Sequence, residues 1–435
     1  MTSRLRERTT PLDPRSKTEP FADAPFAAQG DAFQEGTAPL WGGPFRWLLL
    51  AHGFSGFAFW GFFGTVFAEA ANRFGADAST MAVLGASISV PFILGALLQG
   101  VIADRWSPKW LSAIGYVILT VAIPIAWGAT SLAWLYASSF LVGGAFATIE
   151  PARSALTGLL VARPDLVRAN SSIAIAFQLS LVLSTLGGGV LLQVVNADAE
   201  YALSTAMGAL SILLVLGVPD VRQHGERPAL SLGDLRVGGA TSWRHPRLRI
   251  LLLVTAAGWT LINVFFVLEP LIVKQTLHRG GDALLYLWAA HGTGALAGAI
   301  VMSRARRATG REATLVCTGI GVIGVGIVIY VGIGLYPVAL VAAGISGIGF
   351  SLLFPPLLAF IQRVAPEDQT GRVTSVFVAV QECMGLASSL AILALGTLLL
   401  VRPTVVVSGS VLGVIGLLGL RALAREEPSR ERTAA

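Results

Sequence analysis

The chain has 435 residues, of which 54% are apolar and 13% charged, and its mean hydropathy is +0.71. Soluble domains carry about a quarter charged residues, so this composition excludes a water-soluble globular protein. A membrane span takes about 20 consecutive apolar residues, so the chain has room for around twelve spans and for no large soluble domain. The net charge of +6 would suggest nucleic-acid binding only if the basic residues were gathered in one patch.

Residues 1–43 are rich in Pro, Arg, Thr and acidic residues and contain no apolar run, so we expect a disordered cytoplasmic tail without a cleavable signal peptide. From residue 44 onward, hydropathy predicts an all-α membrane protein of twelve transmembrane helices. We expect two six-helix bundles, 44–218 and 248–421, a cytoplasmic linker 219–247 with a short amphipathic segment, and a cytoplasmic tail 422–435. The expected helices are 46–70, 80–103, 110–128, 131–152, 170–194, 200–218, 248–273, 283–303, 312–334, 336–361, 373–400 and 404–420.

The Lys and Arg residues predict the orientation of these helices. If the N-terminus is cytoplasmic, 27 of the 31 basic residues fall on the cytoplasmic side, and only Arg73, Lys274, Arg279 and Arg402 fall outside. This asymmetry is the positive-inside rule, and it favours two cytoplasmic termini and an even number of helices. The basic residues are spread over seven segments, so we expect no nucleic-acid partner.

The two halves resemble each other at a spacing of about 202 residues. Because six helices separate the copies, both have the same orientation, which predicts a parallel repeat about an axis normal to the membrane. Chance similarity between apolar helices is the competing explanation, and matching loops at 162–165 and 365–368 argue against it. The matching polar positions are Ser171-Ser172 with Gln178 and Thr374-Ser375 with Gln381.

The loop after the second expected helix reads Gly-Val-Ile-Ala-Asp-Arg-Trp-Ser-Pro-Lys from Gly100 to Lys109. It resembles the cytoplasmic loop signature of the major facilitator superfamily, Gly-x-Leu-Ala-Asp-Arg-x-Gly-Arg-Lys. Gly100 permits close helix approach, while Arg105 and Lys109 suit the anionic inner surface. The resemblance implies a latch between the two halves, in which Asp104 faces Arg372. A generic basic turn is the alternative reading.

Three departures from the signature and from related motifs limit what the resemblance implies. Ser107 and Pro108 replace the usual Gly and Arg of the loop. Ser139 stands where drug-proton antiporters of the superfamily carry an Arg in a Leu-x-x-x-Arg-x-x-x-Gly pattern. The segment 184–189 keeps the final glycines of the antiporter motif and loses its Gly-Pro. The standard coupling mechanism is therefore not supported.

Segments 150–170 and 232–246 look like those of bacterial exporters of the macrolide-efflux and enterobactin-exporter type. This resemblance, which with the loop signature covers residues 44–421, implies a secondary transporter with a central cavity. It implies nothing about the substrate.

Ionisable residues inside spans are rarely placed there without a role. Glu382 lies about 16 Å into its helix, close to the membrane centre, and could carry a proton reversibly. His291 lies at a similar depth, and Glu150 lies on the same helix face as Arg153. For each, a structural role is the alternative: a packed neutral carboxyl, a packed histidine and a local ion pair.

Several polar and aromatic residues are candidates for the substrate cavity. Glu269 and Glu69 lie near the outer mouth, His52 and Asn263 lie on helices that line the cavity in the superfamily, and Gln178 and Gln381 form the repeated pair. An aromatic-lined pocket suits an amphipathic ligand, although packing against lipid explains aromatic helices equally well. The aromatic residues are Phe54, Phe57, Phe59, Trp60, Phe62, Phe63, Phe265 and Phe266.

The sequence thus predicts proton-driven export of a small amphipathic molecule, such as a drug, antibiotic or siderophore-like compound. The predicted transporter is a monomer in the bacterial inner membrane and works by alternating access. An importer or uniporter is the alternative, and a receptor or polytopic membrane enzyme is a remote one. The loops hold no cluster of His, Asp or Glu, so we expect no enzyme activity. Cys317 and Cys383 lie in apolar runs and define neither a disulfide framework nor a metal site, and we expect no cofactor.

Overall fold

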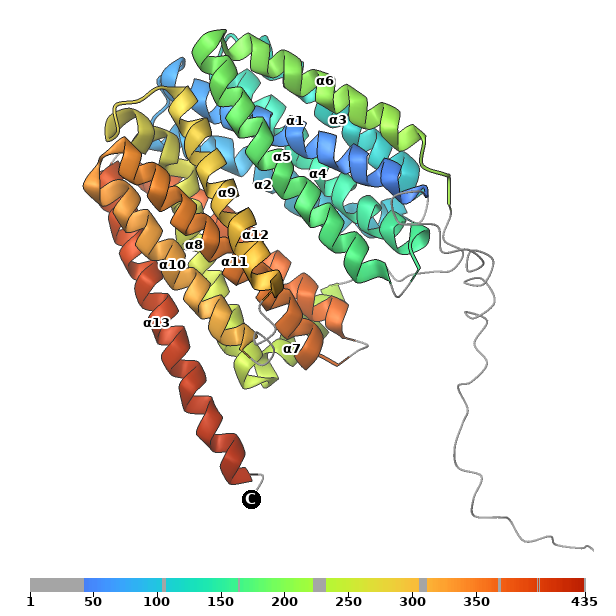
Figure 1. Ribbon diagram of the computed structural model, residues 1–435, viewed down its shortest axis with the longest axis vertical. Helices are drawn as coiled ribbons and strands as arrows, with labels where there is room; N and C mark the ends of the chain where they lie inside the picture. Colours follow the sequence, from blue (N-terminus) through green and yellow to red (C-terminus); the bar gives the residue numbers. More distant parts are fainter. Residues whose placement is uncertain are drawn as a thin grey trace, which may run out of the picture. The chain divides into compact units, whose positions relative to one another are not determined.

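The computed structural model describes residues 43–103, 107–162, 165–221, 232–304, 311–366, 369–396, 398 and 400–433. Every regular element in these residues is an α-helix, and twelve of the thirteen are long and apolar enough to cross a membrane, which confirms the expected fold class. The expected tail 1–43 lies outside the described residues except for Gly43. The helices, shown in Figure 1, are α1 (Phe45–Asn72), α2 (Ala78–Ala103), α3 (Pro108–Trp127), α4 (Leu132–Leu160), α5 (Leu166–Val194), α6 (Ala197–Leu216), α7 (Leu232–Arg244), α8 (Pro246–Gln275), α9 (Gly281–Arg304), α10 (Glu312–Ile333), α11 (Tyr336–Val364), α12 (Thr370–Leu395) and α13 (Val401–Thr433).

The spanning helices form two sets of six, α1–α6 and α8–α13, called here the N-terminal set and the C-terminal set. In the first, α1 packs on α5 and α6, α4 packs on α2 and α3, and α3 packs on α6. In the second, α8 packs on α12 and α13, α11 packs on α9 and α10, and α10 packs on α13. The two sets therefore repeat one packing pattern, as a parallel repeat requires.

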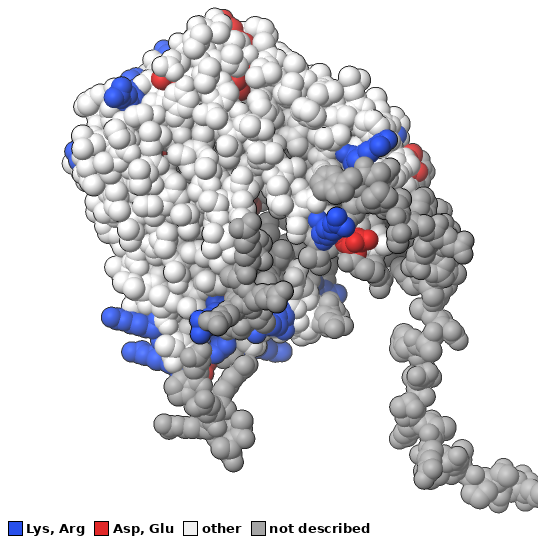
Figure 2. All heavy atoms as spheres, viewed as in Figure 1, with Lys and Arg blue, Asp and Glu red and all other residues white. Residues whose placement is uncertain are grey.

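Charged residues are distributed unequally between the two ends of the helix bundle. Helices α1, α3, α5, α8, α10 and α12 begin at one end, called here the arginine-rich end, and the other six spans begin at the opposite end. In Figure 2, Lys and Arg gather along the lower and right-hand rim, and a broad uncharged band covers the middle of the visible face. Large apolar side chains such as Leu213 and Val301 are two-thirds exposed, at 66% and 67%. This surface suits lipid rather than water.

Local capping residues set where several helices begin. Ser107 accepts a hydrogen bond from the backbone N–H of Trp110 at the start of α3, and Pro108 occupies the first helical position. Asn196 caps α6 in the same way through the N–H of Ala199. A side-chain acceptor at the N-cap and a proline at the first position both suit the unpaired N–H groups there. These caps place the helix starts two or three residues earlier than hydropathy alone predicts.

Close packing of glycine faces fixes the depth of α9 against α11. A Cβ atom at Gly347 would collide with the backbone carbonyl of His291 and would lie 2.8 Å from the backbone nitrogen of Ala295. A Cβ atom at Gly294 would collide with the carbonyl of Gly344. Small residues allow two helix backbones to approach closely in a membrane. The contact holds His291 at a defined height beside α11.

Candidate functional site

The N-terminal and C-terminal sets are joined from the end opposite the arginine-rich end down to the middle of the bundle. Across the joint, α5 packs on α9 and α2 packs on α12. Near the opposite end, the Tyr286 hydroxyl donates to Oε1 of Gln193 at 2.9 Å. About halfway along α5, Nε2 of Gln178 donates to the carbonyl of Gly292 at 3.4 Å, so this predicted cavity residue bridges the sets. The structure is therefore closed at the opposite end.

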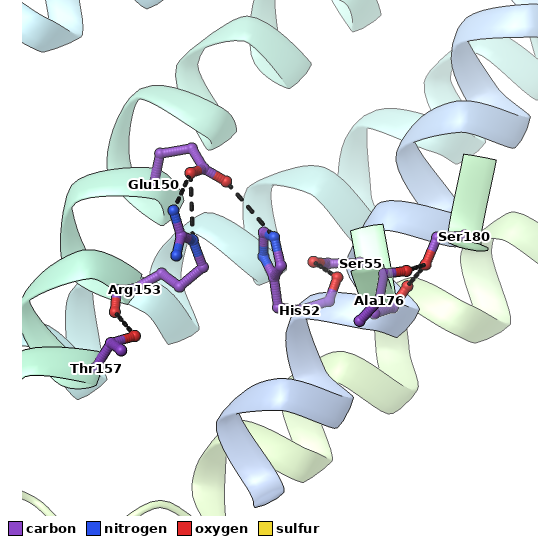
Figure 3. A network of polar contacts seen from close by, with 8 residues as sticks. His52, Ser55, Glu150, Arg153, Thr157, Ala176 and Ser180 are labelled. Carbon is purple, nitrogen blue, oxygen red and sulfur yellow. Dashed lines mark hydrogen bonds and ion pairs between the residues drawn. The ribbon is translucent and has the colours of Figure 1, made fainter. Parts of the chain in front are cut away.

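A charged network lies inside the N-terminal set (Figure 3). Arg153 donates to Oε2 of Glu150 from Nη2 at 2.7 Å and from Nε at 3.2 Å, while Nε2 of His52 lies 3.8 Å from Glu150 Oε1. The His52 ring is 2% exposed and stacks on Phe177 at 5.3 Å, and its Nδ1 has no hydrogen-bond partner among the described residues. The local Glu150–Arg153 ion pair proposed as an alternative is thus present, and it continues to His52. An added proton or an organic cation would change the charge balance of this network.

Aromatic rings connect this network to the C-terminal set. Phe177 lies 5.8 Å from Trp60 of α1, and Trp60 lies 6.4 Å from Trp288 of α9, measured between ring centroids. The indole N–H of Trp60 is buried without a hydrogen-bond partner in the described part of the chain. Buried donors are usually paired, so an unpaired one inside an aromatic cluster is a place for a ligand atom or water. The aromatic cluster comprises Phe59, Trp60, Phe63, Phe146, Phe177 and Trp288.

Glu269 is the polar centre of the C-terminal set. The indole N–H of Trp288 donates to its Oε2 at 2.8 Å, and the Tyr330 hydroxyl donates to its Oε1 at 2.8 Å. Glu269 is 2% exposed, so this carboxyl does not lie at an open outer mouth as predicted from the sequence. Pro270 follows it inside α8, and the helix continues to Gln275. Both carboxyl oxygens are satisfied by neutral donors, which is how a buried carboxyl avoids the cost of unpaired oxygens.

His291 lines a small cavity together with Glu269. Its Nδ1 lies 2.9 Å from Oγ of Ser346 on α11, and Ser346 also donates to the carbonyl of Ala343 at 2.8 Å. The Ser346 hydroxyl has only one proton. When Ser346 donates this proton to the carbonyl of Ala343, the hydrogen bond between Ser346 and His291 must be donated by Nδ1 of His291. Nε2 is then the acceptor of the ring. The cavity is lined by Phe265, Phe266, Glu269, Trp288, His291, Tyr330, Ala343 and Ser346.

Comparison with known proteins identifies the family. Residues 48–389 match the Major Facilitator Superfamily model, which is more than half of the chain. The chain belongs to the Major Facilitator Superfamily. Comparison with curated proteins found no relative.

Solved structures with the same fold include several transporters. A POT family transporter in complex with a thioalcohol-conjugated peptide is 16% identical, with a TM-score of 0.70, and the match covers 88% of this chain and 96% of that one. The nucleoside transporter NupG is 12% identical, with a TM-score of 0.65 and coverage of 87% and 99%. A bacterial homologue of the human lysosomal transporter Spinster, in an inward-facing and unoccupied conformation, is 14% identical, with a TM-score of 0.68 and coverage of 90% and 99%. Family and fold together indicate a multi-pass membrane transporter rather than an enzyme.

Two other predicted residues of this superfamily member are tied into helix contacts. Asn263 Oδ1 accepts a hydrogen bond from Ser388 at 2.7 Å and so joins α8 to α12. Glu69 accepts from the hydroxyl of Tyr201 at 3.0 Å and from Arg73 at 3.2 Å. Glu69 therefore joins α1 to α6 within the N-terminal set.

Glu382 and Gln381 lie halfway along α12 and are half-buried. No hydrogen bond or ion pair joins Glu382 to another described residue, and the contact of His291 is Ser346 rather than Glu382. A direct pair between Glu382 and His291 is thus not formed here. Glu382 therefore lies at mid-depth of α12 without a polar partner in the described chain.

The predicted gate of the superfamily signature is partly visible. Asp104 and Arg105 lie outside the described residues, and Gly100 lies in the last turn of α2. Lys109 donates from Nζ to the carbonyl of Leu216 at 2.8 Å, so it holds the start of α3 to the end of α6. Arg372 lies in the first turn of α12. Its backbone carbonyl lies so close to Gly238 of α7 that a Cβ atom at Gly238 would collide with it.

Sequence reasoning missed the partners of Glu269 and one further acid. Trp288 and Tyr330 lie 19 and 61 residues from Glu269, and no local pattern links them. Glu200 follows the Asn196 cap and reads as an ordinary first-turn acid beside the helix N-terminus, yet its side chain is fully buried. Among the residues that the structure describes, no group of three or more His, Cys, Asp or Glu side chains could hold a metal ion.

Proposed function

We propose that this transporter exports a small amphipathic molecule across the bacterial inner membrane in exchange for protons, as a monomer and by alternating access. In this proposal both termini are cytoplasmic, so the arginine-rich end faces the cytoplasm and the closed end faces outward. The observation that carries it is the His52–Glu150–Arg153 network, which lies against the aromatic cluster shared by the two sets.

The chemistry of the site suits a molecule with an apolar body and a basic or polar group. Aromatic rings supply the apolar contact surface, and the Trp60 N–H supplies an unused donor. Glu150 is 34% exposed and is the anion that a basic group would approach. A proton that binds Glu150 or His52 removes this attraction by neutralising the carboxylate or adding a cation. Proton entry and substrate departure would thereby be linked, as exchange requires.

The network also supplies a cation on the helix whose antiporter Arg is missing. Ser139 stands on α4 at the position of the usual Arg, and its hydroxyl is buried without a hydrogen-bond partner among the described residues. Arg153 lies on the same helix, nearer the arginine-rich end, and forms an ion pair with Glu150. Glu382 on α12 is the second coupling group of the proposal, because it reaches mid-depth without a cationic partner in the described chain.

Import or uniport of a small solute is the second candidate. The missing Arg and the missing Gly-Pro of the antiporter motif favour it. The solved structures with this fold include transporters of peptides and of a nucleoside, so the test panel should contain dipeptides and nucleosides as well as macrolides, siderophores and lipophilic cations.

The test follows protons in inverted membrane vesicles that hold a preset acidic lumen. A transported compound should dissipate the gradient with the wild-type protein, and Glu150→Gln and Glu382→Gln should each remove the response. Asp165→Asn is the matched control, because this exposed carboxyl makes no capping hydrogen bond. Transport of a labelled compound without proton movement would show uniport instead of proton exchange. An unchanged proton response in both Gln variants would overturn the assigned coupling groups.

A further inference from the structure

Glu200 is a buried carboxyl that the proposed exchange does not use. It lies in the first turn of α6, and its side chain is 0% exposed. Ser204 donates to its Oε1 at 3.1 Å, while Oε2 has no hydrogen-bond partner and no ion pair reaches the group from any described residue. A buried acid with one orphaned oxygen and no counterion is unusual in a folded protein.

Two glycines make the space that this carboxyl occupies. A Cβ atom at Gly61 of α1 would collide with Glu200 Oε1 and with the Ser204 hydroxyl, and would lie 2.8 Å from the hydroxyl of Ser184. A Cβ atom at Gly188 of α5 would lie 3.1 Å from both Cδ and Oε2 of Glu200. The carboxyl is therefore enclosed by α1 and α5, with hydroxyl oxygens on one side.

Leu285 of the C-terminal set lies beside this site. The same Cβ position at Gly188 lies 3.1 Å from Cδ1 of Leu285, and a Cβ atom at Gly64 would collide with its Cδ2. Leu285 is itself 0% exposed, so it is seated between α1 and α5. Glu200 thus lies where the two sets meet at the end opposite the arginine-rich end. Separation of the sets at this end would withdraw Leu285 and admit water to the carboxyl.

Other charged groups at this end have their own partners or lie apart from Glu200. Asp198 accepts from the indole of Trp127 at 2.9 Å, and Lys274 donates to the carbonyl of Ala71. Glu69 is held by Tyr201 and Arg73. None forms an ion pair or hydrogen bond with Glu200 in the described chain. The remaining titratable groups on the helices packed around it are Arg46 and His52 on α1, Lys109 and Tyr116 on α3, Arg168 on α5, and Asp282, Tyr286, His291 and Arg304 on α9.

We propose that Glu200 is a proton-binding site that controls opening of this end: the bound proton keeps Leu285 seated, and loss of the proton releases it. A buried anion without a counterion is costly, so the closed arrangement favours the neutral carboxyl. Once Leu285 withdraws, the carboxyl can pass its proton to water and remain ionised. By linkage, the open fraction rises with pH, by up to about tenfold in the open-to-closed ratio per pH unit. This inference requires neither a substrate nor a transport direction.

The experiment measures the distance across this end without substrate. Spin labels on Thr130→Cys and Leu335→Cys, both exposed, report opening in lipid nanodiscs when Cys383 is replaced by Ser; the buried Cys317 can remain. Between pH 5 and 9 we expect the long-distance population to grow in the wild-type background, in Glu200→Asp and in the control Asp198→Asn. Glu200→Gln should stay closed throughout. A pH-independent wild type, or a Glu200→Gln variant that opens as the wild type does, would overturn the proposal.

Two further measurements keep the proposal separate from the proposed function and from misfolding. Glu150→Gln and Glu382→Gln should retain the pH response, and its loss in either variant would assign the response to that residue instead. If Glu200→Gln does not fold, the alternative test is the reaction of the wild-type protein with a hydrophobic carbodiimide. This reagent modifies protonated buried carboxyls. Labelling of Glu200 should fall as the open population grows, and labelling that is constant with pH would refute the inference.

Discussion

Trp288 donates its indole N–H to Glu269 at 2.8 Å and turns its ring toward α1, where it lies 5.2 Å from Phe63 between centroids. One side chain of the C-terminal set therefore contacts a buried acid of its own set and the aromatic cluster of the other. A shift of α9 relative to α1 would move both contacts together, which makes Trp288 a physical link between the sets.

Trp288→Phe should destabilise the protein by about 1–3 kcal/mol, because it leaves one oxygen of a buried carboxyl without its donor. Tyr330→Phe should have a similar effect through the other oxygen. Tyr336→Phe is the control, since its hydroxyl makes only a 3.5 Å contact to Ala283 and is half-buried. Thermal unfolding in detergent measures all three variants, and equal stability of Trp288→Phe and Tyr336→Phe would contradict the expectation.

Trp60→Phe should not cost the free energy of a lost hydrogen bond, because the indole N–H that it removes has no partner in the described chain; only the packing of the smaller ring in the aromatic cluster changes. If the substrate uses this donor, the variant should raise KM by about tenfold, the equivalent of one hydrogen bond. Phe59→Leu, which removes an aromatic ring of the same cluster but no donor, serves as the comparison. An unchanged KM in Trp60→Phe would show that the substrate does not take a hydrogen bond from this residue.

Gly143→Ala and Gly144→Ala form a matched pair on α4. A Cβ atom at Gly143 would collide with the carbonyl of Ile88 on α2 and lie 2.7 Å from Pro91, whereas a Cβ atom at Gly144 meets nothing within 4 Å. Gly143→Ala should therefore cost about 1–3 kcal/mol through overpacking. Gly144→Ala should be neutral or should stabilise by up to about 1 kcal/mol through helix propensity. Chemical or thermal unfolding of the two variants decides, and equal effects would refute the α2–α4 contact.

Asp77, in the loop before α2, supports a prediction of pH dependence. Its Oδ1 accepts a hydrogen bond from the backbone N–H of Thr80 at 2.8 Å, and this bond lowers the pKa of the Asp77 carboxyl below its ordinary value. The folded state favours the ionised Asp77 carboxylate. The contribution of this hydrogen bond to stability is therefore present above the ordinary pKa and is lost as pH falls through the lowered pKa. Asp77→Ala should cost about 1 kcal/mol at neutral pH. The difference from wild type should begin to shrink below about pH 4 and continue to fall with pH through the lowered pKa, as thermal unfolding between pH 3 and 7 can test.

Hydropathy and charge determine much of this protein without reference to contacts. Twelve runs long enough to span a membrane follow directly from residue types, because an apolar stretch of this length has no other stable environment. Repetition of the packing pattern in α1–α6 and α8–α13 was equally visible as a spacing of about 202 residues. The pairing of Glu150 with Arg153 was also accessible, since residues three apart share a helix face.

The tertiary structure decided which acids are buried and what they contact. Glu69, Glu200 and Glu269 all lie near helix ends in the sequence, and only packing distinguishes them. Glu69 meets Tyr201 across 132 residues, Glu269 meets Tyr330 across 61, and Glu200 fits a space left by glycines of two other helices. Burial of a side chain depends on which faces of several helices meet, and that arrangement is a sum of many weak contacts far apart in the chain. Residue type alone therefore sets the spans, while the environment of each ionisable group exists only in the folded bundle.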